Sequence, residues 1–496
     1  MAYRQMERNQ MMIFPASIDE YISEDDPVRA YNAMIDAMGV DALGIKLEPD
    51  KVGCPQYDPM VMMKVLVYGC SYGVRSSRKL ERALHHNLSF IWLAGGLKPD
   101  HKTIARFRRD NQDVLKGLLK QCARICIDMG LIEGNTLFVD GTRFRGNASL
   151  NNQWDENRCK RFMKRIDMRV NEIMKECEVE DGAQSGEGSW VKLKDELKSQ
   201  RKLKSKVEGI LEKIQTEGLK QYNSTDPETG QMHSTHGSFA GYNGQIVVDD
   251  KHGLIVSSDV VSDNNDTGQF ADQIEQANEI LEKPCENACA DAGYSNADEL
   301  EKVDAQGIQV VVPSSRQASG KEPDTFDRTR FQYNAKEDCY ICPEGVKLPF
   351  RRIDRKRKFR EYYGGRGACR NCRHLGVCTK NKTTGRKIIR YENVEIREKI
   401  AAQYEKPSSQ AVYARRKEKV ELPFGHIRRN LGVDNFLMRG LSGVRAEMSI
   451  LTSCFDIARL IGMFGVTGLV KLLSVLKGKP PGLSGTANPD FARATG

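Results

Sequence analysis

The sequence lacks the features that would place the protein in a membrane or outside the cell. A bilayer-spanning helix needs about 20 nearly uncharged residues, and the most apolar stretch, residues 448–476, is interrupted by Asp456, Arg459 and Lys471. The first 15 residues are polar, with no apolar segment and no small-residue cleavage site of the kind a signal peptide has. We therefore expect a cytoplasmic protein without a membrane partner, in which residues 448–476 form a buried pair of helices.

A strong net charge is also absent, but the distribution of charge is uneven. The 76 Lys and Arg residues nearly balance the 67 Asp and Glu residues, which leaves a formal charge of +9. Between Gly345 and Arg390 there are 16 basic and 2 acidic residues, a local charge of +14. A concentrated basic segment indicates a polyanionic partner more strongly than the total charge does. The hydrophobic fraction of 39% excludes wholesale disorder.

Histidine is scarce, with 8 residues, whereas cysteine is not, with 14. In a long chain that is not exported, so many cysteines are not a disulfide framework. Most are scattered among apolar neighbours, which indicates buried thiols. Five others are clustered: Cys339 and Cys342, then Cys369 and Cys372 after 26 residues, then Cys378. Two C-x2-C pairs suit a tetrahedral Zn²⁺ site, so we expect Cys339, Cys342, Cys369 and Cys372 as ligands, with Cys378 as the replacement. A closed four-cysteine site would be structural.

The pattern of apolar residues predicts a mixed α/β core made of three separated pieces. Short helices are expected before residue 130, and Asp58 is placed to cap one of them. Strands are expected over 136–140, 242–249, 254–261, 287–290 and 307–313, with a helix that Asp266 caps. The predicted units are a helical domain (1–130), core pieces (131–150, 231–315 and 401–476), a helical-hairpin insert (151–230), a basic cysteine-rich insert (316–400) and a disordered tail (477–496).

Three acids lie at places where a sheet core would bring them to one edge. Asp140 and Asp291 each end an apolar strand, and Glu421 follows a basic helical segment. Carboxylates with few histidines suit hard cations such as Mg²⁺ or Mn²⁺, and two such ions support phosphoryl transfer. Each acid taken singly is more typical of a turn residue or a surface salt bridge. Asn147, Asn243, Gln245 and Asp249 lie beside the predicted site, where they could orient a ligand or satisfy turns.

Six ordered motifs then carry a resemblance over nearly the whole length. They are YDPM (57–60), YGVRSSRKLE (72–81), PDHKTIARF (99–107), VDGTRFRGN (139–147), GYNGQIVVD (241–249) and ADAGYSN (290–296). With them the chain resembles the DDE-type insertion-sequence transposases of bacteria, which have a ribonuclease-H-like core. The resemblance implies that Asp140, Asp291 and Glu421 are the catalytic triad, with two Mg²⁺ or Mn²⁺ ions. It also supports a structural Zn²⁺ knuckle before the third acid.

The resemblance further implies that basic residues on the third-acid helix hold DNA phosphate. Tyr413, Arg416, Glu421 and Arg428 match the family pattern, except that the spacing from Arg416 to Glu421 is one residue longer than usual. Lys417 shares a helix face with positions 413, 421 and 428, so the choice between Arg416 and Lys417 stays open. Phosphate contacts are also expected from the basic run between the cysteine pairs: Arg351, Arg352, Arg355, Lys356, Arg357 and Lys358.

The expected function is therefore a transposase that cuts DNA at the ends of its element and joins the 3′-hydroxyls to target DNA. The expected partners are double-stranded DNA, as terminal inverted repeats and target, and a second copy of the chain in a dimer or larger complex. The protein would associate with the nucleoid when it is bound to DNA. Two alternatives remain: a metal-dependent nuclease of the same fold without strand transfer, and an inactive zinc-containing DNA-binding descendant.

Overall fold

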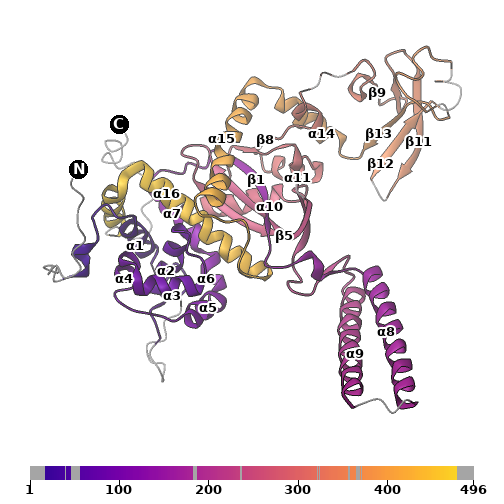
Figure 1. Ribbon diagram of the computed structural model, residues 1–496. Coiled ribbons are helices and arrows are strands. Elements are labelled where there is room, and N and C mark those ends of the chain that lie inside the picture. Colours follow the sequence, from indigo (N-terminus) through magenta and orange to yellow (C-terminus); the bar gives the residue numbers. More distant parts are fainter. Residues whose placement is uncertain are drawn as a thin grey trace, which may run out of the picture.

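The structure is a computed structural model of the chain. It describes residues 17–39, 41–45, 56–182, 187–234, 237–320, 322, 324–355, 358–364, 369, 371–381 and 383–477. The predicted disordered tail (477–496) therefore lies outside the described residues, apart from residue 477. Figure 1 shows one central body from which two separate modules extend.

A six-stranded mixed sheet forms the centre of the body. Strand β5 pairs with β1 on one edge and with β4 and β6 on the other, all antiparallel, and β7 and β8 continue beyond β1 in parallel. The strands are β1 (Thr136–Arg145), β4 (Gly230–Ser234), β5 (Gly237–Asp249), β6 (Ile255–Val261), β7 (Asn287–Cys289) and β8 (Gln309–Val311). The predicted mixed α/β class is confirmed, and the order β6-β5-β1-β7-β8 with β5 reversed is that of a ribonuclease-H-like core.

Helices in the crossovers complete this core. Helix α10 (Phe270–Leu281) links β6 to β7, α11 (Ala297–Asp304) links β7 to β8, and α12 (Ser315–Ala318) follows β8. The long helix α15 (Pro407–Arg429) packs on β1, β5, β7 and β8, although its segment is more than 90 residues downstream of β8. Pro423 lies inside α15 without ending it. The tertiary structure thus joins the three predicted core pieces around one sheet.

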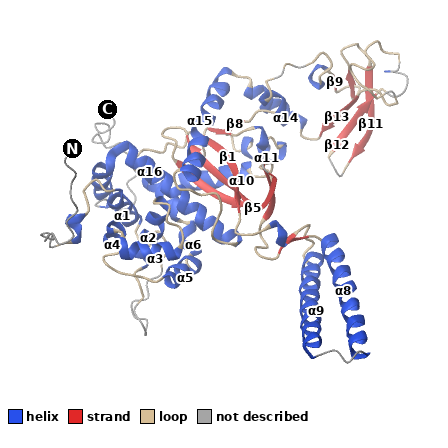
Figure 2. Cartoon of the chain, in the orientation of Figure 1, coloured by secondary structure: helices blue, strands red, loops and turns tan. Residues whose placement is uncertain are grey.

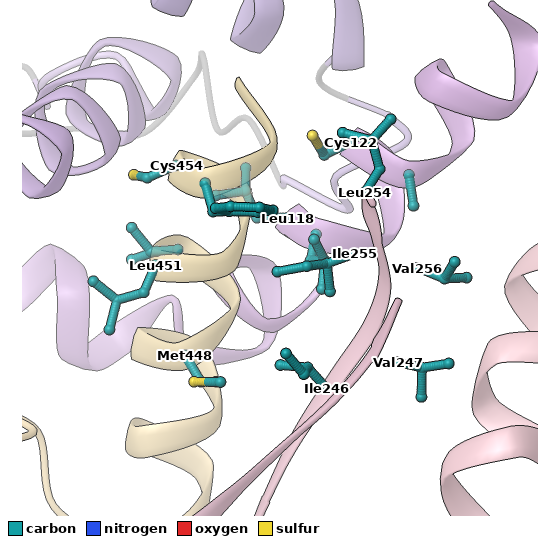
Figure 3. Packing of buried hydrophobic residues seen from close by; sticks show 14 of the residues in the cluster. Leu118, Cys122, Ile246, Val247, Leu254, Ile255, Val256, Met448, Leu451 and Cys454 are labelled. Carbon is teal, nitrogen blue, oxygen red and sulfur yellow. The ribbon is translucent and has the colours of Figure 1, made fainter. Parts of the chain in front are cut away.

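The N-terminal helices pack beside the sheet and around the last helix, α16. Their bounds are α1 (Pro27–Met38), α2 (Pro59–Ser71), α3 (Ser77–His86), α4 (Leu88–Leu93), α5 (His101–Asp110), α6 (Gln112–Lys116) and α7 (Leu118–Asp128). The Asp58 carboxylate accepts the Met60 N–H, so the predicted cap of α2 is confirmed. Figure 3 shows Met448 of α16 on the side of the helix towards Ile246 of the sheet. One apolar cluster therefore unites the N-terminal helices and the central sheet.

Helix α16 (Gly440–Lys477) contains the most apolar stretch of the chain. Gly465 interrupts it with φ 67° and ψ 170°, so two helices meet there, as the sequence predicts. By length and composition alone, Gly440–Leu476 is the one described helix that could span a membrane. Its first half, however, lies in the core, where Val444, Met448, Leu451 and Cys454 are buried.

The predicted helical hairpin is present as the first module, α8 (Glu156–Gly182) and α9 (Glu187–Thr216), which extends away from the body (Figure 1). Two short strands, β2 (Gln153–Trp154) and β3 (Tyr222–Asn223), pair at its base. Near that base, Trp154, Cys159 and Val207 belong to a small separate apolar cluster. Farther out the two helices are linked by ion pairs such as Arg169 with Glu196.

The second module contains a five-stranded antiparallel sheet that the sequence patterns did not predict (Figure 2). Its strands are β9 (Gln332–Asn334), β10 (Cys339–Ile341), β11 (Lys347–Asp354), β12 (Phe359–Tyr363) and β13 (Lys387–Tyr391), and α14 (Val394–Tyr404) leads from it towards α15. Its buried apolar residues include Tyr340, Leu348 and Tyr362. The basic residues Lys347, Arg351 and Arg352 of β11 are exposed and interrupt the pattern of apolar residues, so the alternation in this strand is hard to recognise in the sequence.

Candidate active site

Two of the three predicted acids meet at one edge of the central sheet. Strands β1 and β7 are parallel neighbours in which Phe138 is paired with Cys289. Asp140 and Asp291 each lie two residues beyond that pair, so the register brings them to the same level. Asp291 has just left β7, and its Oδ1 accepts the Gly293 N–H at 2.8 Å, which fixes the turn that follows the strand.

Arg416 of α15 joins the two acids. Its Nη2 lies 3.0 Å from Asp140 Oδ1 and 3.7 Å from Asp291 Oδ2, and its side chain is only 12% exposed. Burial raises the pKa of Asp140 to about 6; the Arg416 charge opposes this rise, and the Asp291 charge adds to it. A carboxyl with this pKa sits among desolvated charged groups, as functional carboxyls commonly do.

Glu421, the third predicted acid, lies on a different side of α15. Its side chain is 65% exposed, and its ion pair is with Lys417 at 3.9 Å. Arg428, seven residues further along the helix, donates to Thr142 Oγ1 at 2.7 Å and to the Arg143 carbonyl at 3.1 Å. The side of α15 that carries Lys417, Glu421 and Arg428 thus passes over the end of β1, just beyond Asp140.

The structure distinguishes Arg416 from Lys417, which the sequence left open. Arg416 contacts the acids, whereas Lys417 is 79% exposed and pairs with Glu421. Tyr413 lies one turn before Arg416 and packs its ring against Tyr404 at 5.2 Å. Burial raises the pKa of Tyr413, which keeps its hydroxyl protonated.

Asp266 is a carboxylate near this site, although the sequence predicts it to be a helix cap. Its expected role as the cap of α10 is wrong, because Gln269 is the N-cap and the helix begins at Phe270. Instead, Asp266 Oδ1 accepts from Asn243 Nδ2 and from Gln245 Nε2, each at 2.7 Å. A usable signal was the Asn243-x-Gln245 spacing, which sets two amides on one face of β5.

Two other polar residues that were expected beside the site have structural partners. Asn147 Nδ2 donates to the Leu437 carbonyl at 2.9 Å. Asp249 is 1% exposed and accepts the N–H groups of Gly134 and Lys251, which anchors the β5–β6 turn. Of the four polar residues named from sequence, Asn243 and Gln245 donate to Asp266, and Asn147 and Asp249 serve the fold.

Four of the five clustered cysteines line one cavity in the second module, which we call the cysteine cavity: Cys342, Cys369, Cys372 and Cys378. Burial and the three other sulfurs raise the pKa of Cys378, whereas the Arg386 charge lowers it. The Val346 N–H lies 3.3 Å from Cys342 Sγ and donates to it.

Cys339 lies outside the cysteine cavity, contrary to the expected ligand set. It is buried in β10, and its Sγ lies 3.7 Å from Glu337 Oε2. Successive side chains of a strand point to opposite faces. Cys339 and Cys342 are separated by an odd number of positions, so in this extended segment they do not face the same cavity, as they would in a tight turn. Cys378 takes the place expected for Cys339.

The donor sets suit two different metals, although no ready-made site is present among the residues that the structure describes. There, no three His, Cys, Asp or Glu side chains are arranged to hold an ion. At the acids, the Arg416 guanidinium is paired with Asp140 and Asp291. By donor type alone, carboxylate oxygens suit Mg²⁺ or Mn²⁺ and thiolates suit Zn²⁺.

The basic run predicted to contact phosphate forms the β11–β12 hairpin. Arg352 pairs with Glu361 at 2.6 Å, and Glu361 is only 3% exposed, so this arginine serves the fold. Arg351 lies over the Tyr363 ring and donates to its carbonyl. Arg355 and Lys358 are exposed at the turn. The remaining two predicted residues, Lys356 and Arg357, lie outside the described part of the chain.

Comparison with known proteins adds sequence relationships to this geometry. The family described as Transposase domain (DUF772) matches residues 16–110, and the family described as Transposase DDE domain matches residues 341–461. The second match includes Arg416, Glu421 and Arg428. A search of curated proteins gave no match.

A piggyBac transposase chain, solved by cryo-EM in a synaptic complex with hairpin DNA, aligns over 95% of this chain and 86% of its own length. The identity is 10% and the TM-score is 0.32, and a likeness of that size does not establish a shared fold. The sequence matches are more specific, because two transposase domains occur in one chain, one over the N-terminal helices and one over α15. Both matches are to transposase families, and together they support a transposase of the DDE type.

Proposed function

We propose that the protein cuts DNA at the ends of its element and joins the freed 3′-hydroxyls to target DNA. The single observation that carries this proposal is the meeting of Asp140 and Asp291 at one sheet edge under Arg416 of α15, the helix that the DDE-domain match covers. Asp140 comes from β1, Asp291 follows β7, and the sheet register sets them level. The order of these residues is that of a DDE core.

The residues of the site divide into acids that bind metal and bases that bind phosphate. Asp140 and Asp291 would hold the metal, and Glu421 is proposed as the third acid because it lies between Arg416 and Arg428 on the helix that crosses β1. When bound, two Mg²⁺ or Mn²⁺ ions would activate the attacking oxygen and stabilise the leaving oxygen. Lys417 and Arg428, on the side of Glu421, are proposed to hold the DNA backbone.

Arg416 offsets part of the negative charge of the site before metal binds. It places one positive charge between two carboxylates that would otherwise repel each other. Opposite charge within 4–6 Å favours the ionised form of a carboxyl, so Arg416 helps to keep Asp140 available as a ligand. Its Nε is buried without a hydrogen-bond partner, which suits a side chain that changes partners when substrate arrives.

The second module is proposed to be a structural zinc module that presents basic residues to DNA. Cys342, Cys369, Cys372 and Cys378 would hold the ion, because all four line the cysteine cavity. The β11–β12 hairpin then carries exposed Arg355 and Lys358 at its turn. Such phosphate contacts would make DNA affinity fall steeply with salt.

The test is strand transfer by the purified full-length chain, with a DNA fragment that carries the element ends, a plasmid target and Mg²⁺. Target-joined product is expected from the wild type and is expected to be lost with Asp291→Asn. Asp304→Asn is the matched control, because Asp304 is the last residue of α11 and pairs with Lys399 of α14. Full activity of Asp291→Asn would contradict the assignment of the site.

The same assay separates the proposal from its alternatives. Cleaved ends without joined product would indicate a nuclease. Binding of the end fragment without any Mg²⁺-dependent cleavage would indicate an inactive DNA-binding descendant. Sedimentation of the protein with and without end DNA tests the proposed dimer or larger assembly, which is expected to form on DNA that carries two ends.

A further inference from the structure

The loop between β6 and α10 holds a carboxylate, Asp266, that the triad does not include. Its Oδ1 accepts two hydrogen bonds from amides that are themselves buried, Asn243 at 1% and Gln245 at 0% exposure. The Tyr294 hydroxyl donates to Gln245 Oε1, which leaves the Gln245 NH₂ pointing to Asp266. Two buried amides thus hold one oxygen of a half-buried carboxylate, and Tyr294 holds one of these amides in turn.

Two glycines make the space that this carboxylate occupies. A Cβ at Gly141 would lie 2.6 Å from Asp266 Oδ1 and 2.3 Å from Gln245 Nε2. A Cβ at Gly293 would lie 3.8 Å from Asp266 Oδ2. Gly141 directly follows Asp140, and Gly293 is two residues after Asp291. The chain next to both predicted metal ligands therefore lacks side chains at the points where Asp266 approaches.

Asp266 lies close enough to act electrostatically with the acidic pair. The same Cβ position at Gly293 is 2.9 Å from Asp291 Oδ1, so an oxygen of Asp266 and an oxygen of Asp291 both lie within 4 Å of one point. The Asp266 charge also contributes to the raised pKa of Asp140. Burial raises the pKa of Tyr294, and among the nearby acids Asp266 adds more to that rise than Asp140 or Asp291 does. Three carboxylates and Arg416 therefore form one charged group.

We propose that Asp266 is a fourth acidic residue of the site, whose Oδ2 binds a divalent cation beside Asp291. Asn243, Gln245 and Tyr294 are then positioning residues, which act through Asp266. This assignment rests on the proposed metal-dependent function. It follows a general feature of metal sites, in which outer hydrogen bonds orient a ligating carboxylate. Mg²⁺ and Mn²⁺ take oxygen ligands, and a further carboxylate helps to offset the positive charge that Arg416 brings to the site.

Asp266→Asn separates ligand binding from simple anchoring of the loop. Asparagine has the shape of aspartate, and its Oδ1 can still accept from Asn243 and Gln245, while its NH₂ replaces the oxygen that faces Asp291. A residue that only anchors the loop tolerates this change. A metal ligand does not, because an NH₂ group cannot coordinate a cation. Asp263→Asn is the matched control, since Asp263 lies in the same loop, is exposed and contacts Gln269.

The experiment measures Mn²⁺ binding to the full-length, DNA-free protein by the electron paramagnetic resonance signal of free Mn²⁺, for the wild type, Asp266→Asn, Asp263→Asn and Asp140→Asn. We expect Asp266→Asn and Asp140→Asn each to weaken binding by about tenfold or more, with Asp263→Asn unchanged. Wild-type affinity in Asp266→Asn, with loss in Asp140→Asn, overturns this inference alone. Wild-type affinity in both variants contradicts the proposed metal site itself.

A second variant covers the case in which Asp266→Asn unfolds the loop. Gly141→Ala keeps all the acids and fills the space that Asp266 occupies, so it should also weaken Mn²⁺ binding. Thermal denaturation without metal shows whether each variant is folded. If Asp266→Asn loses stability without metal while Gly141→Ala binds Mn²⁺ as the wild type does, Asp266 is a structural residue and the inference is overturned.

Discussion

The cysteine cavity predicts that Cys378, and not Cys339, is needed for zinc. Cys378 lines the cavity with Cys342, Cys369 and Cys372, whereas Cys339 is buried in β10 with its Sγ 3.7 Å from Glu337. Burial raises the pKa of Cys339 and of Cys378 alike, so the position of Cys339 outside the cavity, and not its acidity, is what excludes it. The two variants to compare are Cys378→Ser and Cys339→Ser.

The expected size of the effect follows from the binding free energy of structural zinc, about 10–16 kcal/mol in zinc-finger peptides. Shared among four thiolates, this is roughly 2.5–4 kcal/mol per ligand, or a loss of about 10²–10³-fold in affinity. Cys378→Ser should therefore lose its zinc to a chelator that leaves the wild-type metal in place. Cys339→Ser should keep one equivalent, because its sulfur faces Glu337 rather than the cavity.

The assay is the zinc content of the purified chain by mass spectrometry, before and after exposure to a chelator, together with limited proteolysis. Loss of the ion should open the five-stranded sheet to protease, since its buried apolar cluster is small and includes partly buried cysteines of the cavity. Zinc retained by Cys378→Ser and lost by Cys339→Ser would refute the reasoning. An absence of zinc from the wild-type chain would refute the proposed module as a whole.

Three further predictions concern charged groups inside the body. Arg416→Met removes the cation beside Asp140, so the pKa of Asp140 should rise above about 6. The midpoint of the pH dependence of Mn²⁺ affinity should then rise by about 1–3 pH units. A midpoint that is unchanged or lower contradicts this prediction. Arg75→Met leaves Glu447, whose side chain is 7% exposed, without its ion-pair partner, and should cost about 3 kcal/mol, measured by the urea midpoint, with the exposed Arg109→Met as a control that changes little. Burial raises the pKa of Asp456 well above its ordinary range, so the unfolded chain releases this proton at a lower pH than the folded chain does. The free energy of unfolding therefore falls as pH rises above about 4, by about 1.4 kcal/mol per pH unit, until the pH reaches the pKa of Asp456 in the folded chain. Asp456→Asn should therefore gain on the wild type between pH 5 and pH 8 in urea unfolding, whereas a difference that is constant with pH would contradict the linkage.

Local patterns in the sequence were enough to predict most of the elements of the body. Short helices before residue 130 and the Asp58 cap could be predicted because such caps act within one turn. The hairpin α8–α9 and the break in the last helix also follow from local composition. The five-stranded sheet was missed because its strands are short and its hairpin is mostly charged.

The site could be predicted only in part. Asp140 and Asp291 were found because a strand that ends in an acid can be read from neighbouring residues, and the resemblance placed them in order. That Arg416 rather than Lys417 contacts them was not predicted, because the face of α15 that packs on the sheet depends on the sheet itself. Asp266 was taken for a helix cap, since its partners on β5 are more than 20 residues away.

The sequence by itself determined the helices and their caps, the separation of acids from bases along the chain, and two sets of possible metal ligands. These depend on interactions between residues a few positions apart. The tertiary structure alone decided which acids meet, which arginine lies between them and which cysteines share a cavity. Those choices depend on strand register and on packing across hundreds of residues, as when β1 and α15 bring Asp140 to Arg416 over 276 positions.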